Sequence, residues 1–189
     1  QDNKDDAAHE MTVAARGISK AAEILAGKFT FVATNVPYLG RRKQSKVLMD
    51  YCADVYPEAK SELATCFIER ALEFCSEGGT TSMVAPQQWL FLKTFEAFRK
   101  KLLKVASWDF VCRLGLHAFQ TPLFVVVAIH SFTARKPNSS TKLTGFDVGS
   151  ALSPELKAHA LTDCEIAVVS QLEQLKNPDT AIVFSEASA

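Results

Sequence analysis

Four consecutive residues, Asn35-Val36-Pro37-Tyr38, combine groups that can hold a flat, amine-bearing base. The amide oxygen of Asn35 can accept one hydrogen bond from an exocyclic amino group, and the backbone carbonyl of Val36 can accept a second. The ring of Tyr38 can stack on the face of the base. Stacking combined with hydrogen bonds to the base edge is how enzymes hold a base flipped out of a duplex. Taken alone, the tetrapeptide also fits a simple turn at the end of a strand.

The residues before the tetrapeptide determine where it lies in the fold. Residues 29–34 are nearly all apolar and β-favouring, which is typical of a strand covered on both faces. Ligands on open α/β sheets bind beyond the carboxyl ends of the strands. We therefore expect the tetrapeptide at the ligand-binding edge of a sheet.

The tetrapeptide is close to the Asn-Pro-Pro-Tyr motif of amino-group methyltransferases, with Val36 at a position where that motif usually has proline. Further segments follow in the order found in the BREX-type (PglX-like) adenine-specific DNA methyltransferases, which are large phage-defence enzymes: Lys60-Ser61-Glu62-Leu63, residues 67–72, Gly78-Gly79 and residues 86–92. The chain resembles the C-terminal half of their catalytic domain over roughly residues 8–185.

This resemblance implies methyl transfer from S-adenosylmethionine to the N6 of a flipped adenine, with Asn35, Val36, Pro37 and Tyr38 as the catalytic residues. Adenine N6 is a poor nucleophile because its lone pair is delocalised into the ring. Two acceptors on the amino group would favour a more tetrahedral nitrogen aimed at the methyl donor. Valine supplies the same backbone carbonyl as proline, and a residue before proline is already biased toward extended conformations.

The cofactor-binding motif of that family is missing from this chain. It is a glycine-rich turn, whereas the eight glycines here include no two that are separated by one residue. The sequence also begins with Gln1 rather than methionine. We therefore interpret the chain as a fragment of a larger DNA methyltransferase of restriction-modification and phage defence, inactive in isolation. A split subunit and a decayed module are the alternatives.

The expected partners are DNA and the missing N-terminal methyltransferase half or other defence-system subunits, with a homodimer of the fragment as a further option. Two alternatives to DNA adenine methylation stay open. One is an amino-methyltransferase that acts on RNA or on a protein glutamine, because both use the same motif chemistry. The other is a catalytically inactive DNA- or partner-binding module.

Several residues near the tetrapeptide are further candidates for DNA binding. Arg41, Arg42 and Lys43 can contact phosphates beside the flipped base, and a solvated loop explains them nearly as well. Phe119, near a predicted hairpin turn, can stack on the opposite side of the base. Trp89 follows a predicted strand, so it either lines the pocket or packs in the core.

Composition indicates an ordinary globular protein of 189 residues, 48% hydrophobic and with no net charge. The longest apolar run, residues 123–129, is too short to span a membrane as a helix. The five cysteines and four histidines show no spacing suited to a metal. This cysteine usage fits the reducing cytoplasm, which is the expected location.

Hydrophobic periodicity predicts an α/β fold: the second half of a Rossmann-like methyltransferase sheet, with parallel strands, a terminal antiparallel hairpin and flanking helices. Strands are expected at 29–34, 80–85, 108–114 and 123–132, and helices at 11–25, after Pro57, and at 95–105. The basic face of the last helix, with Arg99 and Lys100, is expected to face solvent. Residues 39–57 lack clear periodicity.

Residues 1–134 are predicted to form the catalytic half and residues 135–142 a linker, because the latter are rich in turn-forming and charged side chains. Residues 143–189 are predicted to form a short α/β extension. Helical segments are expected there at 154–161 and 164–175, and a last strand at 180–184.

Overall fold

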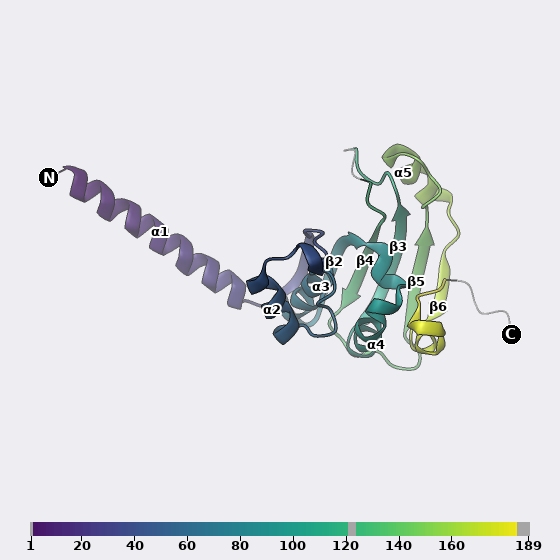
Figure 1. Ribbon diagram of the computed structural model, residues 1–189. Helices are drawn as coiled ribbons and strands as arrows, with labels where there is room; N and C mark the ends of the chain where they lie inside the picture. The colour runs from purple at the N-terminus through teal and green to yellow at the C-terminus, as the bar shows by residue number, and fades with distance from the viewer. Residues whose placement is uncertain (1, 121–123, 185–189) are drawn as a thin grey trace.

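The computed structural model describes residues 2–120 and 124–184, which form a mixed sheet with helices, one of them long and extended (Figure 1). Gln1, residues 121–123 of the expected strand and the turn before it, and residues 185–189 of the expected extension lie outside the described residues. The helices are α1 (Asp2–Ala26), α2 (Lys46–Val55), α3 (Leu63–Phe74), α4 (Glu96–Val105) and α5 (Pro154–Asp163). The strands are β1 (Phe29–Asn35), β2 (Cys75–Pro86), β3 (Ser107–Gly115), β4 (Val127–Thr133), β5 (Lys142–Asp147) and β6 (Ala167–Ser170).

The strands form one six-stranded sheet in the order β1-β2-β4-β3-β5-β6. β1 is parallel to β2 and β3 to β5, whereas β4 is antiparallel to both of its neighbours and β6 is antiparallel to β5. β3 and β4 pair antiparallel, as the sequence predicted, and the described residues between them form no helix. The predicted α/β class is therefore confirmed. The expected linker, residues 135–142, connects β4 to β5 within this sheet, and its last residue, Lys142, is the first residue of β5.

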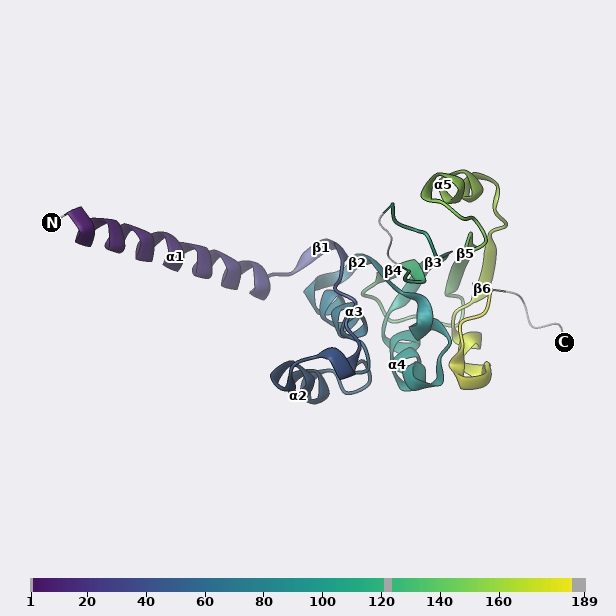
Figure 2. The same cartoon turned by 45° about the horizontal axis from the view of Figure 1, so that its top comes forward.

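The helices α3 and α4 cover one face of the sheet, α3 against β1 and β2 and α4 against β3 (Figure 2). The core lies between these layers and includes Met83 and Ala85 from β2 and Phe98 and Leu102 from α4. No helix in the described part of the chain is long and apolar enough to cross a membrane.

The prediction that both faces of β1 are covered was wrong. Six of its seven side chains are exposed, including that of Phe31, which is 60% exposed. β1 is an edge strand because it pairs only with β2 among the described strands. The helix before it, α1, extends away from the sheet in both views (Figures 1 and 2), and its Met11 and Ile18 are exposed.

Two predictions for the C-terminal residues were also wrong. The expected helix at 164–175 is replaced by β6 and a 3-10 helix, Leu172–Lys176. Gln171 separates these two elements: its side chain is fully buried, donates to the carbonyls of Leu103 and Ala106, and accepts from the backbone of Trp108. The expected strand at 180–184 is instead a 3-10 turn, Pro178–Thr180, followed by residues without regular structure.

The helix α2 was not predicted, because most of its surface faces solvent. Cys52 is its only buried residue, so this short helix packs on the rest of the protein over a small area. The helix begins after Ser45, whose hydroxyl accepts a hydrogen bond from the backbone of Leu48.

Candidate functional site

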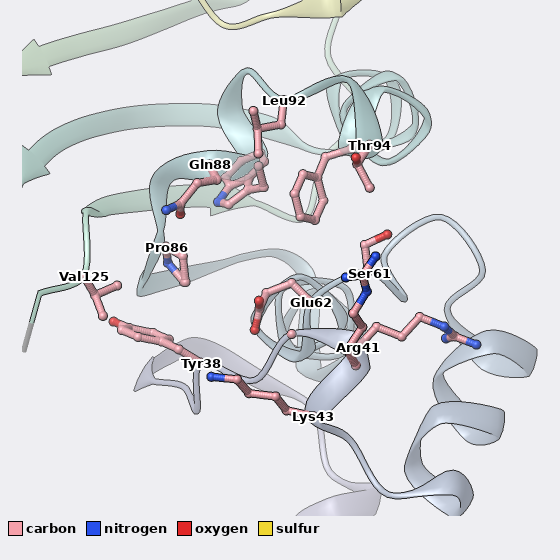
Figure 3. A pocket seen from close by; sticks show the side chains of 14 residues that line it. Tyr38, Arg41, Lys43, Ser61, Glu62, Pro86, Gln88, Leu92, Thr94 and Val125 are labelled. Atoms are coloured by element: carbon pink, nitrogen blue, oxygen red, sulfur yellow. The ribbon is translucent and has the colours of Figure 1, made fainter.

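A cavity of about 660 Å³ lies where the chain leaves the carboxyl ends of β1 and β2 (Figure 3). This is the edge at which open α/β sheets bind their ligands. The described lining residues come from four segments: the one after β1, the residues just before α3, the end of β2 with the turn after it, and the segment before β4. In that order they are Tyr38, Gly40, Arg41, Arg42, Lys43; Ser61, Glu62; Pro86, Gln88, Trp89, Leu92, Thr94, Phe95; and Val125.

The tetrapeptide begins at the last residue of β1, as predicted. Asn35 is exposed, and its amide oxygen accepts a hydrogen bond of 3.1 Å from the hydroxyl of Tyr38. An amide oxygen has two lone pairs, so it keeps one acceptor position while it binds Tyr38. Tyr38 lines the cavity, and its partial burial raises the pKa of its hydroxyl, which keeps that hydroxyl protonated and able to donate.

Val36 and Pro37 differ in their environments. Val36 is 4% exposed and belongs to the hydrophobic core, whereas Pro37 is exposed. The side chain of Val36 therefore anchors the tetrapeptide to the body of the protein. Neither residue is among those that line the cavity, and Pro37 instead lines a second pocket between α2 and α3.

Replacing Val36 with proline is expected to leave the protein folded and to raise its stability slightly, by up to about 1 kcal/mol. Proline restrains the unfolded chain, keeps the backbone carbonyl, and presents an apolar ring to the core. Urea denaturation measures the change, and Val36→Ala, which keeps the carbonyl but loses core contacts, is the control that should be destabilised. An unfolded Val36→Pro protein would mean that the backbone N–H or the branched side chain is indispensable.

The three basic residues after the tetrapeptide all line the cavity, but they point in different directions. The guanidinium of Arg41 donates to the carbonyl of Met49 in α2 at 3.2 Å, and Figure 3 shows it turned toward that helix. Figure 3 shows the ammonium group of Lys43 on the side of Tyr38. Arg42 and Lys43 are exposed, so they remain available to a phosphate.

Glu62 is a site residue that the sequence did not identify as functional. Its carboxyl points into the space that also contains Tyr38 and Pro86 (Figure 3). One of its oxygens, Oε1, is buried and has no hydrogen-bond partner among the described residues, and burial raises the pKa of this carboxyl. The sequence signal was present, since Glu62 lies in one of the segments that carry the family resemblance, but nothing local placed it opposite Tyr38.

The turn after β2 forms the opposite wall of the cavity. Trp89 lines the cavity and is also 2% exposed, so both roles considered for it from the sequence are correct. Its indole packs edge-on against Phe98 and His130, with ring centroids 5.5 Å apart in each case. Phe119, in contrast, is half-buried and does not line the cavity.

In the part of the chain that the structure describes, no three His, Cys, Asp or Glu side chains lie together in a way that could hold a metal ion. The cavity walls offer an aromatic ring, a carboxyl and basic side chains; Asn35 is not among the lining residues and adjoins the cavity through its hydrogen bond to Tyr38. These groups suit a planar, hydrogen-bonding ligand attached to an anionic backbone.

Comparison with known proteins identifies similar sequences. Residues 1–118 match the family described as Eco57I restriction-modification methylase. The adenine-specific methyltransferase PglX of Lacticaseibacillus casei (strain Zhang) is 32% identical over 133 residues, which are 69% of this chain and 10% of that protein. The adenine-specific methyltransferase BrxX of Escherichia coli O9:H4 (strain HS) is 31% identical over 118 residues, 58% of this chain and 10% of that protein. The chain thus spans about a tenth of the length of these curated relatives.

Solved structures share the fold. The Type ISP restriction-modification enzyme LlaGI, solved in complex with a DNA substrate mimic, has a TM-score of 0.60 at 16% identity over 77% of this chain and 15% of its own. A type I restriction-modification methyltransferase subunit from Streptococcus thermophilus has a TM-score of 0.58 at 17% identity over 82% of this chain and 37% of its own. These likenesses confirm the predicted methyltransferase-type sheet.

Proposed function

Since this chain belongs to the family of Eco57I restriction-modification methylases, we propose that it is the target-base half of a larger S-adenosylmethionine-dependent enzyme that methylates the N6 of an adenine flipped out of DNA. One observation carries the proposal: Asn35 and Tyr38 are hydrogen-bonded to each other at the carboxyl end of β1, beside a cavity large enough for a base. The relatives that match this region are named adenine-specific methyltransferases.

In this proposal Asn35 and the carbonyl of Val36 hold the amino group of the base. Tyr38 donates to one lone pair of the Asn35 amide oxygen and thereby fixes the amide with its other lone pair available to the N6 hydrogen. The same tyrosine ring stacks on the base. These contacts position the nitrogen and favour its lone pair for attack on the methyl donor, without a general base before the attack.

Arg42 and Lys43 are proposed to bind the phosphates beside the flipped nucleotide. Both are exposed at the rim of the cavity. Arg41 is assigned a structural part, because its guanidinium is bound to the carbonyl of Met49. Phe119 does not line the cavity, so its role as a second stacking ring would require the segment around it to approach the base.

S-adenosylmethionine supplies the methyl group and is proposed to bind outside this chain. The chain lacks the glycine-rich turn that binds it in the family, and it spans about a tenth of the curated relatives. β1 offers a free sheet edge and α1 an exposed apolar stripe, and both are surfaces that the cofactor-binding half of a longer protein would cover.

Nucleoside analysis of methylated products tests the proposal directly. The full-length protein that contains this chain should convert adenine in double-stranded DNA to N6-methyladenine, with S-adenosylmethionine as the only added cofactor. Methylation of RNA or of protein glutamine would favour the alternative amino-methyltransferases. DNA binding without any methylated product would favour a catalytically inactive binding module.

The isolated chain of 189 residues is expected to show no measurable binding of S-adenosylmethionine. The physical reason is the missing turn, which leaves no backbone N–H groups arranged around the cofactor. Titration calorimetry measures this, with the full-length protein as the positive control. Saturable micromolar binding to the isolated chain would show that its own residues build a cofactor pocket.

A further inference from the structure

The structure assigns a positioning role to Arg99 and to the C-terminal segment Asn177–Phe184, which we call the strap. Together they hold in place the cavity wall, defined here as residues 87–95. The contacts described below are sufficient to support this structural role, whatever the function of the protein. Its value for catalysis rests on the proposed function, in which the wall shapes the site of the flipped base.

Arg99 is completely buried, although its helix was predicted to turn its basic face toward solvent. Its guanidinium joins the wall to the strap through backbone carbonyls. On the wall side it donates to the carbonyl of Trp89 and, at 2.8 Å, to that of Leu92. On the strap side it donates to the carbonyls of Thr180 at 3.0 Å and Asp179 at 2.7 Å. The planar fork of arginine can reach both sides at once, which a single ammonium group cannot.

The strap also binds the wall directly. The backbone N–H of Ile182 donates to the carbonyl of Leu90 at 2.9 Å, and the side chain of Ile182 is 1% exposed. Its carbonyl in turn accepts from Arg113 of β3 at 2.6 Å, so the strap is fixed to the sheet as well. Consecutive carbonyls of the wall, those of Trp89 and Leu90, are therefore held by different donors.

The conformation of the strap fits this role. Asp179 and Thr180 both have left-handed backbones, with φ of 50° and 55°, which side-chain-bearing residues adopt only at a cost. This turn presents both of their carbonyls to the guanidinium of Arg99. The side-chain amide of Asn177 donates to the carbonyl of Ala181 at 2.8 Å and stabilises the same turn.

The strap lies beyond residue 118, where the match to the methylase family ends. The cavity wall lies within that match, since residues 87–95 precede its end. The wall of the candidate base site is thus held by a segment that the family match does not include. Arg99 is the residue that connects the two.

Hydrogen exchange of the full chain tests the holding role. In Arg99→Lys, the positive charge is kept but the link between wall and strap is lost. The amides of Phe91, Leu92, Phe95 and Ile182 should exchange on the order of tenfold faster or more, while those of β4 keep their protection. Arg70→Lys is the matched control, because Arg70 is a helical arginine that bonds Glu73 and the carbonyl of Leu25, far from the wall in sequence.

Unchanged exchange at those amides, or an equal acceleration in β4, would overturn the inference, since Arg99 would then be either dispensable or a general stabiliser. If Arg99→Lys does not fold, the variant Asn177→Ala tests the same holding role. It removes the hydrogen bonds from the Asn177 amide to Ala181 and Gln174 and leaves Arg99 intact. The same amides should then exchange a few-fold faster, and no local change would overturn the inference.

Methylation kinetics of the full-length protein separate this inference from the proposed function. Arg99→Lys should lower kcat on the order of tenfold and leave KM for S-adenosylmethionine unchanged. Faster local exchange with unchanged kcat would confirm that Arg99 and the strap hold the wall. It would also show that the reaction does not use the wall, which contradicts the proposed base site.

Discussion

Replacing Asn35 with alanine in the full-length protein that contains this chain is expected to lower kcat of the proposed methyl transfer by roughly 100-fold or more, by analogy with the loss of one oxyanion-hole donor. The amide oxygen is the acceptor that we assign to the N6 amino group, and alanine removes it. Folding should be unaffected, because Asn35 is exposed and its side chain bonds only the hydroxyl of Tyr38 among the described contacts. Cofactor binding should also be unchanged.

Transfer of a labelled methyl group to DNA measures this effect, and calorimetry with S-adenosylmethionine checks the cofactor site. Asn138→Ala is the matched control, because it makes the same substitution in an exposed turn between β4 and β5. That variant should keep full activity. If the methyl-transfer activity of Asn35→Ala is within a few-fold of wild type, the assignment of this motif to catalysis is wrong.

Acidification is expected to destabilise the protein strongly through His130. This side chain is fully buried, both ring nitrogens lack hydrogen-bond partners among the described residues, and its ring stacks on Phe132 at 4.7 Å. Burial disfavours the charged ring and lowers its pKa from 6.5 to about 3. Below pH 6.5 the unfolded chain therefore binds a proton that the folded chain does not, and stability falls as the pH falls toward 3.

The expected size follows from about 1.36 kcal/mol per pH unit within that window. Between pH 7 and pH 4, wild type should lose roughly 3 kcal/mol more than His130→Leu, as measured by urea denaturation at each pH. At pH 7 the leucine variant should be nearly as stable as wild type, because it removes unpartnered polar atoms. His159→Gln, at an exposed position, is the control that should keep the wild-type slope. Parallel pH curves for wild type and His130→Leu would contradict the prediction.

Arg99 shows why the prediction that the basic face of α4 is exposed was wrong at one residue. A run of basic residues on one side of a helix normally faces solvent, and Lys100 and Lys104 do so. Arg99 is buried because Asp179 and Thr180, about 80 residues further along, provide carbonyls for it. Local periodicity contains no information on such a distant partner.

The two secondary-structure predictions for the C-terminal residues were wrong for a related reason. The residues 180–184 have a strand-like composition, but their backbone bonds the wall and Arg113 rather than a neighbouring strand. The segment 164–175 was predicted to be a helix. The side-chain amide of Gln171 instead bonds backbone groups at the end of α4 and the start of β3. In both segments a specific tertiary hydrogen bond outweighed a weak local preference.

The sequence by itself determined which groups lie at the end of β1, namely an amide, a carbonyl and an aromatic ring. It also determined the hairpin of β3 and β4 and membership of a methylase family. These depend on neighbouring residues, on alternation along a strand and on the order of segments. The tertiary structure alone decided that Glu62 faces Tyr38 across a cavity, that β1 is exposed, and that Arg99 ties the cavity wall to the strap. The physical reason is that burial and hydrogen-bond partners are set by segments far apart in the chain, and only the folded chain brings those segments together.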